Sequence, residues 1–334
     1  MFNKKNDKKL NILEILKQSS TPLSGKKITK VLEQNGIKIS ERTVRLYLLE
    51  LDEEGLTEQR GKKGRIITAE GLKEIGAESL LERVGFMSAK IDQFTFKMNF
   101  DLYTRSGTVI INTTIVDRDI LAKHLDKITR VFEKGFAMGT LVGLIKHGKE
   151  QGNILIPEGK IGLCTVCSVT LNGVLLKHGI PAQSIFSGLL ELVDSKPRRF
   201  VELIHYNGTS INPLSLFIRG GMTNYIGAIT NGNGLIGAGF REVPADCYDL
   251  VVQLADKLDR IGLGAFQTIG KPGMPLYNIP VREGCSGVVV IGGLNPTAVL
   301  EESGVRLDSY ALSGLMDFSE LFSYTELKDR LMSL

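Results

Sequence analysis

The feature that most constrains the fold is an internal repeat in the C-terminal part of the chain, because a duplicated segment must build the same elements twice. A stretch beginning "IPEGKIGLCTVCSVTLNGVLL" at Ile156 returns as "IPVREGCSGVVVIGGLNPTAVL" from Ile279. The matched residues are Ile-Pro at 156–157 and 279–280, Val166 with Val289, Leu-Asn at 171–172 and 294–295, Gly179 with Gly304, Ser184 with Ser309, and Ser-Gly-Leu at 187–189 and 313–315. This alignment places Cys164 opposite Gly287 and Cys167 opposite Val290.

The segment upstream of the first copy predicts an α+β unit. Residues 94–103 alternate apolar and polar side chains, which predicts a half-buried strand, and "TVIINTTIV" predicts a second strand. Leucines and other apolar residues then recur at helical spacing across residues 117–135. "GTVIINTTIV" has a counterpart in "GLIGAGFREV" from Gly234. We therefore expect a body, residues 94–334, made of two α+β halves.

The halves are expected to span about residues 94–205 and 214–320 and to be related by a pseudo-two-fold axis. A linker over residues 79–93, "GAESLLERVGFMSAK" with its flanks, joins them to an N-terminal head, residues 1–78. A sheet with helices packed on it buries its apolar face, so the body is of the α+β class.

The head carries three short helical patterns followed by a hairpin pattern. The third pattern, "ISERTVRLYLLELDEEG", begins at Ser40, a good N-cap residue, and turns Val44, Leu48 and Leu51 inward at helical spacing. Two strand-like runs then flank Gly61-Lys62-Lys63-Gly64. Three helices and a basic hairpin form a winged helix, whose third helix enters the DNA major groove.

Charge is concentrated in the head. Residues 1–65 hold 15 Lys and Arg against 9 Asp and Glu, whereas the whole chain has a net charge of only +4. This layout favours a nucleic-acid reader, with a helical protein-interaction module as the alternative. Arg42 and Arg45 are the base-edge candidates because arginine matches guanine O6 and N7. The full set of predicted DNA-binding residues is Ser40, Arg42, Thr43, Arg45, Tyr47, Lys62, Lys63 and Arg65.

"CTVCSVTLNG", residues 164–173, allows several interpretations. Cys164 and Cys167 lie three apart on a strand-like run, where side chains point to opposite faces, and the chain has no second Cys or His pair at metal-ligand spacing. We therefore expect no metal site. No base is placed to activate a catalytic thiol, so we expect no catalytic residue either. Both sulfurs could simply be buried in the core.

The remaining interpretation makes this segment the wall of an anion site. Ser168, Thr170 and Asn172 stand where the strand reaches a helix N-terminus, and "GGLNPT" provides a second such terminus. Arg219 and Arg241 lie beside glycines, which allows a carboxylate to approach a guanidinium fork. Thr114 takes the place of Arg241 in the first half, so the halves differ chemically.

These motifs resemble a known family. "CTVCSVTLNGVLLKHGIPAQSIFSGLLEL", "PRRFVELIHYNGTSINPLSLFIRGGMT", "GAGFREVP" and "GVVVIGGLNPTAVLEESG" are similar to the regulatory domain of the nitrogen regulatory repressor (NrpR) family, and the head resembles the ribonuclease R winged helix. The resemblance implies a homodimeric repressor of nitrogen-assimilation genes that binds a palindromic double-stranded DNA operator and is released by 2-oxoglutarate. This chain has one such regulatory domain, whereas some members of the family carry two in tandem.

The resemblance makes a small dicarboxylate, 2-oxoglutarate, the expected effector, with no further cofactor. The candidate contacts are Thr165, Cys167, Ser168, Thr170, Asn172, Arg219, Thr223 and Arg241. A small-acid enzyme fused to a DNA-binding head, a regulator of another anionic metabolite and a dimerisation module without ligand are the alternatives. The chain shows neither a signal peptide nor an apolar run of membrane-spanning length, so we expect a cytoplasmic protein.

Overall fold

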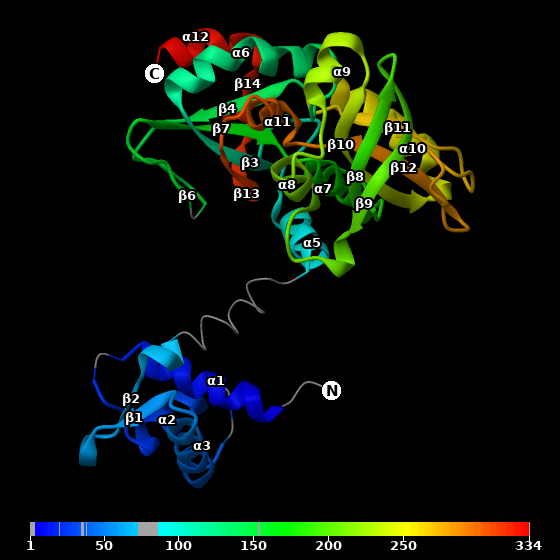
Figure 1. The fold of residues 1–334 in the computed structure, drawn as a ribbon. Coiled ribbons are helices and arrows are strands. Elements are labelled where there is room, and N and C mark those ends of the chain that lie inside the picture. The colour runs from blue at the N-terminus through cyan, green and yellow to red at the C-terminus, as the bar shows by residue number, and fades with distance from the viewer. Residues whose placement is uncertain are drawn as a thin grey trace. The chain divides into compact units, whose positions relative to one another are not determined.

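The computed structural model describes residues 4–19, 21–34, 37, 39–72, 86–152 and 154–333. The chain divides into two compact units, residues 1–85 and 86–334, which Figure 1 shows.

The described part of the first unit holds three complete helices around a small core, and residues 69–72 begin a further helical segment. The three complete helices are α1 (Lys4–Lys17), α2 (Gly25–Gln34) and α3 (Glu41–Glu53). Ser40 begins α3 as predicted, since its hydroxyl accepts a hydrogen bond from the Thr43 backbone N–H at 3.1 Å. Val44, Leu48 and Leu51 are buried against Ile12 and Leu13 of α1 and Ile28 and Leu32 of α2.

A hairpin follows these three helices. Strands β1 (Thr57–Gln59) and β2 (Arg65–Ile67) pair antiparallel around a short 3-10 turn at Gly61–Lys63. Gly64 has φ 123°, and a Cβ there would stand 2.3 Å from the Leu23 carbonyl oxygen, so only glycine allows the chain to close against Leu23. The predicted winged helix is confirmed.

The second unit contains two five-stranded sheets. The first has the order β13-β3-β7-β4-β14 and the second β11-β12-β10-β8-β9. The strands are β3 (Thr108–Asp117), β4 (Leu141–Ile145), β7 (Lys160–Val166), β8 (Gln183–Val193), β9 (Lys196–His205), β10 (Gly234–Pro244), β11 (Phe266–Ile269), β12 (Cys285–Ile291), β13 (Asp308–Asp317) and β14 (Phe322–Ser323); β5 (Glu150–Gln151) and β6 (Ile154–Leu155) form a separate hairpin.

Helices cover both sheets (Figure 1). They are α5 (Met87–Lys97), α6 (Arg118–Glu133), α7 (Val169–Lys177), α8 (Pro213–Arg219), α9 (Tyr225–Asn231), α10 (Tyr248–Arg260), α11 (Asn295–Glu302) and α12 (Leu327–Met332). The described strands and helices confirm the α+β class.

The repeat is visible as one topology used twice. The order β3, α6, β4, β7, α7, β8 recurs as β10, α10, β11, β12, α11, β13. The halves also exchange a strand, because β8 pairs with β10 in the second sheet and β13 pairs with β3 in the first. Each sheet therefore depends on both halves of the sequence.

The strand registers fix which residues are equivalent. Thr114 lies opposite Leu163 on one side and Ser309 on the other, and Arg241 lies opposite Val288 and Ser184 in the same way. Thr114 is thus the twin of Arg241, as the sequence alignment predicts. The pairing of Ser184 with Ser309 is confirmed as well.

The predicted equivalents of the cysteines are wrong by two residues. Cys164 pairs with Thr113 as Val289 pairs with Phe240, so Val289 rather than Gly287 is its twin. The Cys167 N–H donates to the Ile110 carbonyl at 2.8 Å and the Gly292 N–H donates to the Gly237 carbonyl at 2.9 Å, which equates Cys167 with Gly292. The second copy therefore has two more residues between its Ile-Pro pair and the strand, and Val166 with Val289 and the matching Leu-Asn pairs are not equivalent positions.

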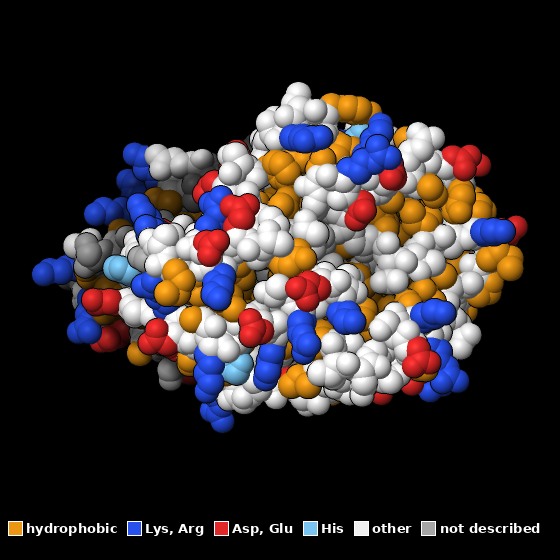
Figure 2. Space-filling view, turned by 90° about the horizontal axis from the view of Figure 1, so that it is seen from above, with side chains coloured by type: hydrophobic (Ala, Val, Ile, Leu, Met, Phe, Trp, Pro, Cys, Tyr) orange, Lys and Arg blue, Asp and Glu red, His pale blue; other side chains and the backbone are white. Residues whose placement is uncertain are grey.

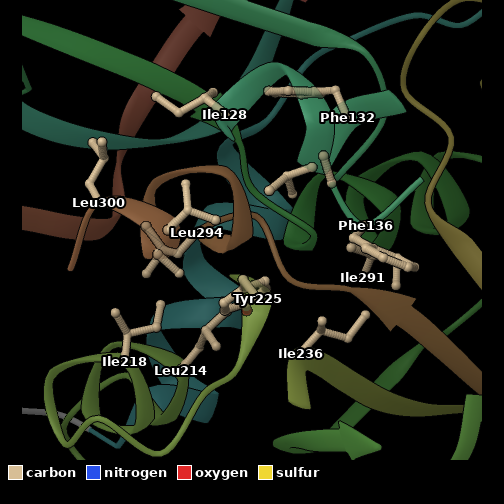
Figure 3. Packing of buried hydrophobic residues seen from close by; sticks show 14 of the residues in the cluster. Ile128, Phe132, Phe136, Leu214, Ile218, Tyr225, Ile236, Ile291, Leu294 and Leu300 are labelled. Atoms are coloured by element: carbon tan, nitrogen blue, oxygen red, sulfur yellow. The ribbon is translucent and has the colours of Figure 1, made fainter. Parts of the chain in front are cut away.

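The buried side chains of this unit form two clusters that mirror one another. One cluster joins α6 and α11 and the other joins α10 and α7, with the described strands between them. Figure 3 shows the first cluster, in which Tyr225 is surrounded by Leu214, Leu294 and Ile236. The Tyr225 hydroxyl donates to Asn295 Oδ1 at 2.5 Å and accepts from the Gly237 N–H at 2.7 Å, which satisfies polar groups at the centre of the core.

The strand predicted at residues 94–103 is wrong. Residues 87–97 form α5, whose Met87 and Ile91 are buried one helical turn apart, while Phe96 is exposed. Met98, Phe100 and Leu102 do alternate inward. This segment belongs to no named strand, and its β-pairing is an isolated bridge between Asp101 and Ser106. Part of the predicted linker, residues 87–93, is therefore helical; residues 79–85 lie outside the described residues.

The surface of the molecule in Figure 2 carries acidic and basic side chains interspersed with apolar ones. Mixed charge of this kind is the ordinary solvated surface of a globular domain. Buried charged groups are therefore a more specific indication of a ligand site than this surface is.

Candidate functional site

Helix α3 presents one exposed face in the first unit. Arg42, Arg45, Leu46 and Leu49 lie on that face at spacings of three and four, opposite the buried residues Val44 and Leu48. The Arg45 side chain is 70% exposed and pairs with Glu41 at 2.5 Å. Such an exposed pair within one helix contributes roughly 0.3–0.5 kcal/mol, so the guanidinium can exchange it for a DNA group at little cost.

Two predicted DNA-binding residues are placed differently from expectation. Tyr47 is buried against the helical core rather than facing outward, because it stands three residues after Val44 and four before Leu51 on the inner face of α3. The Arg65 side chain is 15% exposed, and its Nε donates to Asp52 at 2.7 Å. Arg65 therefore ties the hairpin to α3.

The other residues of the predicted set are accessible to different degrees. Lys63 is exposed at the hairpin tip, and the side chain of Lys62 lies outside the described residues. The hydroxyls of Ser40 and Thr43 lie 2.7 Å apart at the start of α3. The start of α3 and the hairpin tip are thus the parts of the described winged helix available to a DNA backbone.

The second unit contains a buried cation. Arg241 on β10 is 2% exposed, and its partners are neutral: Nε donates to Asn172 Oδ1 at 2.5 Å, and Nη2 donates to the carbonyl oxygen and hydroxyl of Ser168 at 2.9 and 3.2 Å. Burial lowers the pKa of the guanidinium, although Tyr206 and Cys167 nearby oppose this shift. Arginine nevertheless stays protonated in proteins, so a positive charge is held in the interior.

The remaining nitrogen, Nη1, is buried and has no hydrogen-bond partner among the described residues. Gly239 leaves space beside it: a Cβ added there would lie 3.7 Å from Nη1 and 3.5 Å from the Tyr206 hydroxyl, both ordinary contact distances. Burying an unpaired charge is costly unless an opposite charge arrives. The geometry thus suits an anion that reaches Nη1.

Cys167 lies near this arginine and near a second cation. Burial raises the pKa of its thiol, while Arg241 and Lys90 both act on it in the opposite direction. Lys90 belongs to α5 and is exposed to solvent, and partial desolvation by the atoms around its ammonium group lowers its pKa. Two positive charges therefore approach the segment that the sequence singled out.

A groove of about 710 Å³ lies on the α5 side of this cluster. Its walls include Lys90, Lys97 and Arg219, and no acidic side chain lines it among the described residues. Leu312, whose backbone N–H interacts with Cys167, also lines the groove. A small anion entering the groove would therefore meet positive charge on α5 and α8.

Other predicted effector residues have structural partners. The Thr170 hydroxyl accepts from the Ile110 N–H at 3.1 Å and donates to the Ile110 carbonyl at 3.0 Å. Thr165 is buried and accepts from Asn112 Nδ2 at 3.4 Å. The Thr223 hydroxyl donates to Glu302 at 2.8 Å, and the same carboxylate accepts the first backbone N–H groups of α9. A carboxylate of the protein thus already occupies the place beside Thr223.

The helix N-terminus is also less open than predicted. The Thr170 and Leu171 N–H groups donate back to the carbonyls of Cys167 and Ser168 at 2.9 and 3.2 Å. The structure therefore brings together Arg241, Asn172, Ser168 and Cys167 from the predicted set, places Arg219 on the neighbouring groove, and assigns Thr165, Thr170 and Thr223 to internal contacts.

The twin of this cluster carries no charge. Thr114, Thr297 and Ser309 occupy the positions equivalent to Arg241, Asn172 and Ser184, and the Thr114 hydroxyl lies 3.4 Å from Thr297 Oγ1 and 3.0 Å from Ser309 Oγ. In the charged copy, Asn172 Nδ2 donates to Ser184 Oγ at 2.9 Å. The same scaffold thus holds a hydroxyl network in one half and a guanidinium in the other.

Comparison with known proteins gives a consistent result over most of the chain. The sequence model "NrpR regulatory domains NRD1 and 2" matches residues 84–323, and "Ribonuclease R winged-helix domain" matches residues 10–75. The global nitrogen regulator NrpRI of Methanosarcina mazei is 31% identical over 94% of this chain and 97% of its own. The chain belongs to the NrpR family.

Longer NrpR proteins show the same similarity. The global nitrogen regulators NrpR of Methanococcus maripaludis and Methanocaldococcus jannaschii are each 32% identical, and this chain covers 55% of their length. A solved structure, that of a nitrogen repressor-like protein from Methanococcus jannaschii, has a TM-score of 0.60 and 27% identity over 72% of this chain and 98% of that one. These relatives are regulators, and this NrpR family member is a regulatory protein rather than an enzyme.

Two residues of the candidate site were not predicted. Tyr206 follows β9, and its buried hydroxyl lies near Arg241 and Ser187; burial raises its pKa. Lys90 falls in the segment interpreted as a linker. The spacing of Lys90, Phe94 and Lys97 on one helical face could have indicated α5 and its basic side, had the alternation after residue 94 not favoured a strand.

The described residues contain no cluster of three or more His, Cys, Asp or Glu side chains that could hold a metal ion. Across the same residues, no helix has the length and apolarity needed to cross a membrane.

The four thiols of this NrpR family member should differ in reactivity. Cys164 and Cys167 are buried, and burial raises the pKa of Cys164 to about 12 and that of Cys167 above its ordinary value, whereas Cys247 and Cys285 are partly exposed. Because the thiolate is the reactive form, we expect two thiols to react promptly with Ellman's reagent at pH 8 and two only after denaturation. Four promptly reacting thiols would show that the segment around Cys167 opens to solvent.

Proposed function

We propose that this protein is a homodimeric repressor of nitrogen-assimilation genes that binds a palindromic operator in the cytoplasm and is released from it by 2-oxoglutarate. The family membership and the winged helix support DNA binding and nitrogen regulation. The observation that carries the effector proposal is the buried, unpaired Nη1 of Arg241 beside Gly239. A carboxylate there would supply the counter-charge that the described residues do not.

The proposed effector site comprises Arg241, Ser168, Asn172, Cys167 and Tyr206. A dicarboxylate with one carboxylate on Arg241 would extend its other end toward the groove that Lys90, Lys97 and Arg219 make positive. Two carboxylates joined by a short chain fit two separated positive regions better than a monocarboxylate does. 2-Oxoglutarate has this charge distribution, whereas glutamine lacks the second carboxylate.

The proposed route to DNA begins at α7, which carries Ser168 at its start and Asn172 within it. Helix α5 packs on α7 closely, since a Cβ on Gly173 would stand 2.5 Å from Met98 at the end of α5. Helix α5 is also the first described element after the segment that leads from the winged helix. Reorganisation of α7 around a bound anion would therefore be transmitted to the start of the regulatory unit.

Release requires only a modest difference in affinity. A dimer presents two copies of α3 to half-sites about one DNA turn, roughly 34 Å, apart, so an effector that favours another separation weakens binding. A tenfold loss of operator affinity corresponds to about 1.4 kcal/mol of coupling. The effector must then bind the released form about ten times more tightly than the DNA-bound form.

The test is an operator titration by fluorescence anisotropy with and without effector. We expect 2-oxoglutarate to weaken operator binding at least tenfold and to raise the melting temperature of the DNA-free protein. Glutamate and glutamine, added separately, test whether a different nitrogen metabolite is sensed. Release by glutamine alone, with no response to 2-oxoglutarate, would reject the dicarboxylate effector while leaving the repressor function intact.

A further inference from the structure

The exposed face of α3 contains two leucines that the fold does not use. Leu46 and Leu49 are each 53% exposed, whereas Val44, Leu48 and Leu51 of the same helix are buried. A leucine on a helix surface is common, but two of them one turn apart form a continuous apolar strip. This strip lies where a winged helix meets DNA bases.

Basic residues define what can cover this strip. Arg42 and Arg45 lie on the same face, one turn before Leu46 and Leu49 respectively, and Lys63 is exposed at the hairpin tip of the same unit. Glu53 shares the face at its far end, and Glu41 is paired with Arg45. A partner must therefore combine negative charge around its edges with apolar groups at its centre.

Duplex DNA meets both requirements in its major groove. Phosphates line the groove edges, and the C5-methyl group of thymine is the apolar feature that a base pair presents on its floor. Apolar side chains on a recognition helix contact this methyl group, which distinguishes thymine from cytosine without a hydrogen bond. A leucine side chain in contact with this methyl group would bury apolar surface on both partners.

We infer that Leu46 and Leu49 read thymine C5-methyl groups in the major groove, so that each operator half-site contains thymine where the middle of α3 lies. The inference rests on the proposed DNA-binding function and adds a specificity determinant to it. Arg42 and Arg45 then select guanine or contact phosphate beside the thymines, and the leucines supply selectivity that the arginines cannot.

The experiment removes the methyl group from the DNA and the side chain from the protein. The wild-type full-length protein selects a duplex from a random-sequence pool, and that duplex is synthesised once with thymine and once with deoxyuridine at every thymine. Anisotropy titrations compare the wild type, the double variant Leu46→Ala/Leu49→Ala and the control Leu72→Ala, whose leucine is exposed in the same unit but lies outside α3.

We expect the wild type and Leu72→Ala to bind the deoxyuridine duplex about 250-fold more weakly, since each buried methyl contact changes affinity by roughly fourfold and a dimer would make four of them, two in each half-site. The double variant should bind the thymine duplex correspondingly weakly and distinguish the two duplexes by less than twofold. Sedimentation velocity, run on the same samples, reports the oligomeric state.

Other outcomes overturn the inference in distinguishable ways. If the wild type binds both duplexes equally, α3 does not read methyl groups. If the double variant still loses affinity on deoxyuridine as the wild type does, another element reads them. If the double variant dissociates into monomers, the strip is a contact between copies of the chain. If the wild type selects no duplex at all, the proposed DNA-binding function fails together with the inference.

Discussion

Replacing Arg241 by methionine is expected to abolish the response to 2-oxoglutarate while leaving DNA binding intact. Hydrogen bonds to charged groups contribute about 1.5–3 kcal/mol each. Losing the guanidinium that binds a carboxylate should therefore weaken effector binding by roughly 100-fold or more. The wild type should gain about 2.7 kcal/mol of stability at a ligand concentration of 100 Kd. A thermal-shift titration of Arg241→Met with 2-oxoglutarate should show almost none of this gain.

The unliganded variant should still fold. Methionine removes the hydrogen bonds to Asn172 and Ser168 but also removes a buried charge that no carboxylate balances, and these effects oppose one another. We expect the free energy of unfolding to change by less than about 2 kcal/mol. The matched control is Thr114→Ala, at the equivalent position of the other half, which should keep the full effector response.

A second substitution tests the same site without touching the arginine. Gly239→Ala places a methyl group in the space beside Nη1, and no neighbouring atom lies within 3.4 Å of that methyl position. It should therefore block an anion without straining the protein. If both Gly239→Ala and Arg241→Met respond to 2-oxoglutarate like the wild type, the effector binds elsewhere.

The winged helix was predictable because its signals are local. Ser40 caps α3 within three residues, and Gly61 and Gly64 mark the hairpin turn, so sequence spacing alone indicates these elements. The strand predicted at residues 94–103 was wrong for a related reason. Phe94 and Phe96 belong to the end of α5, and the inward alternation begins only at Met98. Period-two spacing cannot separate these two segments where they meet.

The site was only partly predictable because it joins both halves of the repeat. The sequence indicated Arg241 and Asn172 as polar residues near glycines, but their 2.5 Å contact depends on β8 crossing to pair with β10. The burial of Arg241 follows from the same exchange, as does the approach of Tyr206. Lys90 required α5 to be recognised first. Pairings between strands far apart in sequence leave no local trace, so they emerge only from the fold.

Replacing Arg45 by alanine is expected to weaken operator binding by about 10- to 100-fold at each half-site, and by the product of the two losses for the dimer. A good bidentate contact to a base contributes roughly 1–3 kcal/mol of discrimination, and Arg45 is the more exposed end of an ion pair on the outer face of α3. Anisotropy titrations on operator and on unrelated duplex should show the larger loss on the operator. The response of the remaining binding to 2-oxoglutarate, measured as a ratio of affinities, should be unchanged.

The acidic partner of Arg45 offers a control of opposite sign. Glu41→Gln frees the Arg45 guanidinium and removes a negative charge from the surface facing DNA, so operator affinity should rise about two- to fivefold at low salt and less at high salt, where exposed charges are screened. A merely structural role for the pair would make Glu41→Gln and Arg45→Ala weaken binding alike.

The Arg45→Ala variant also separates a base contact from a phosphate contact. If it lowers affinity equally for operator and unrelated duplex, and reduces the slope of log affinity against log salt concentration by about one, then Arg45 contacts phosphate rather than a base. Sequence recognition would then depend on Arg42 and the two exposed leucines.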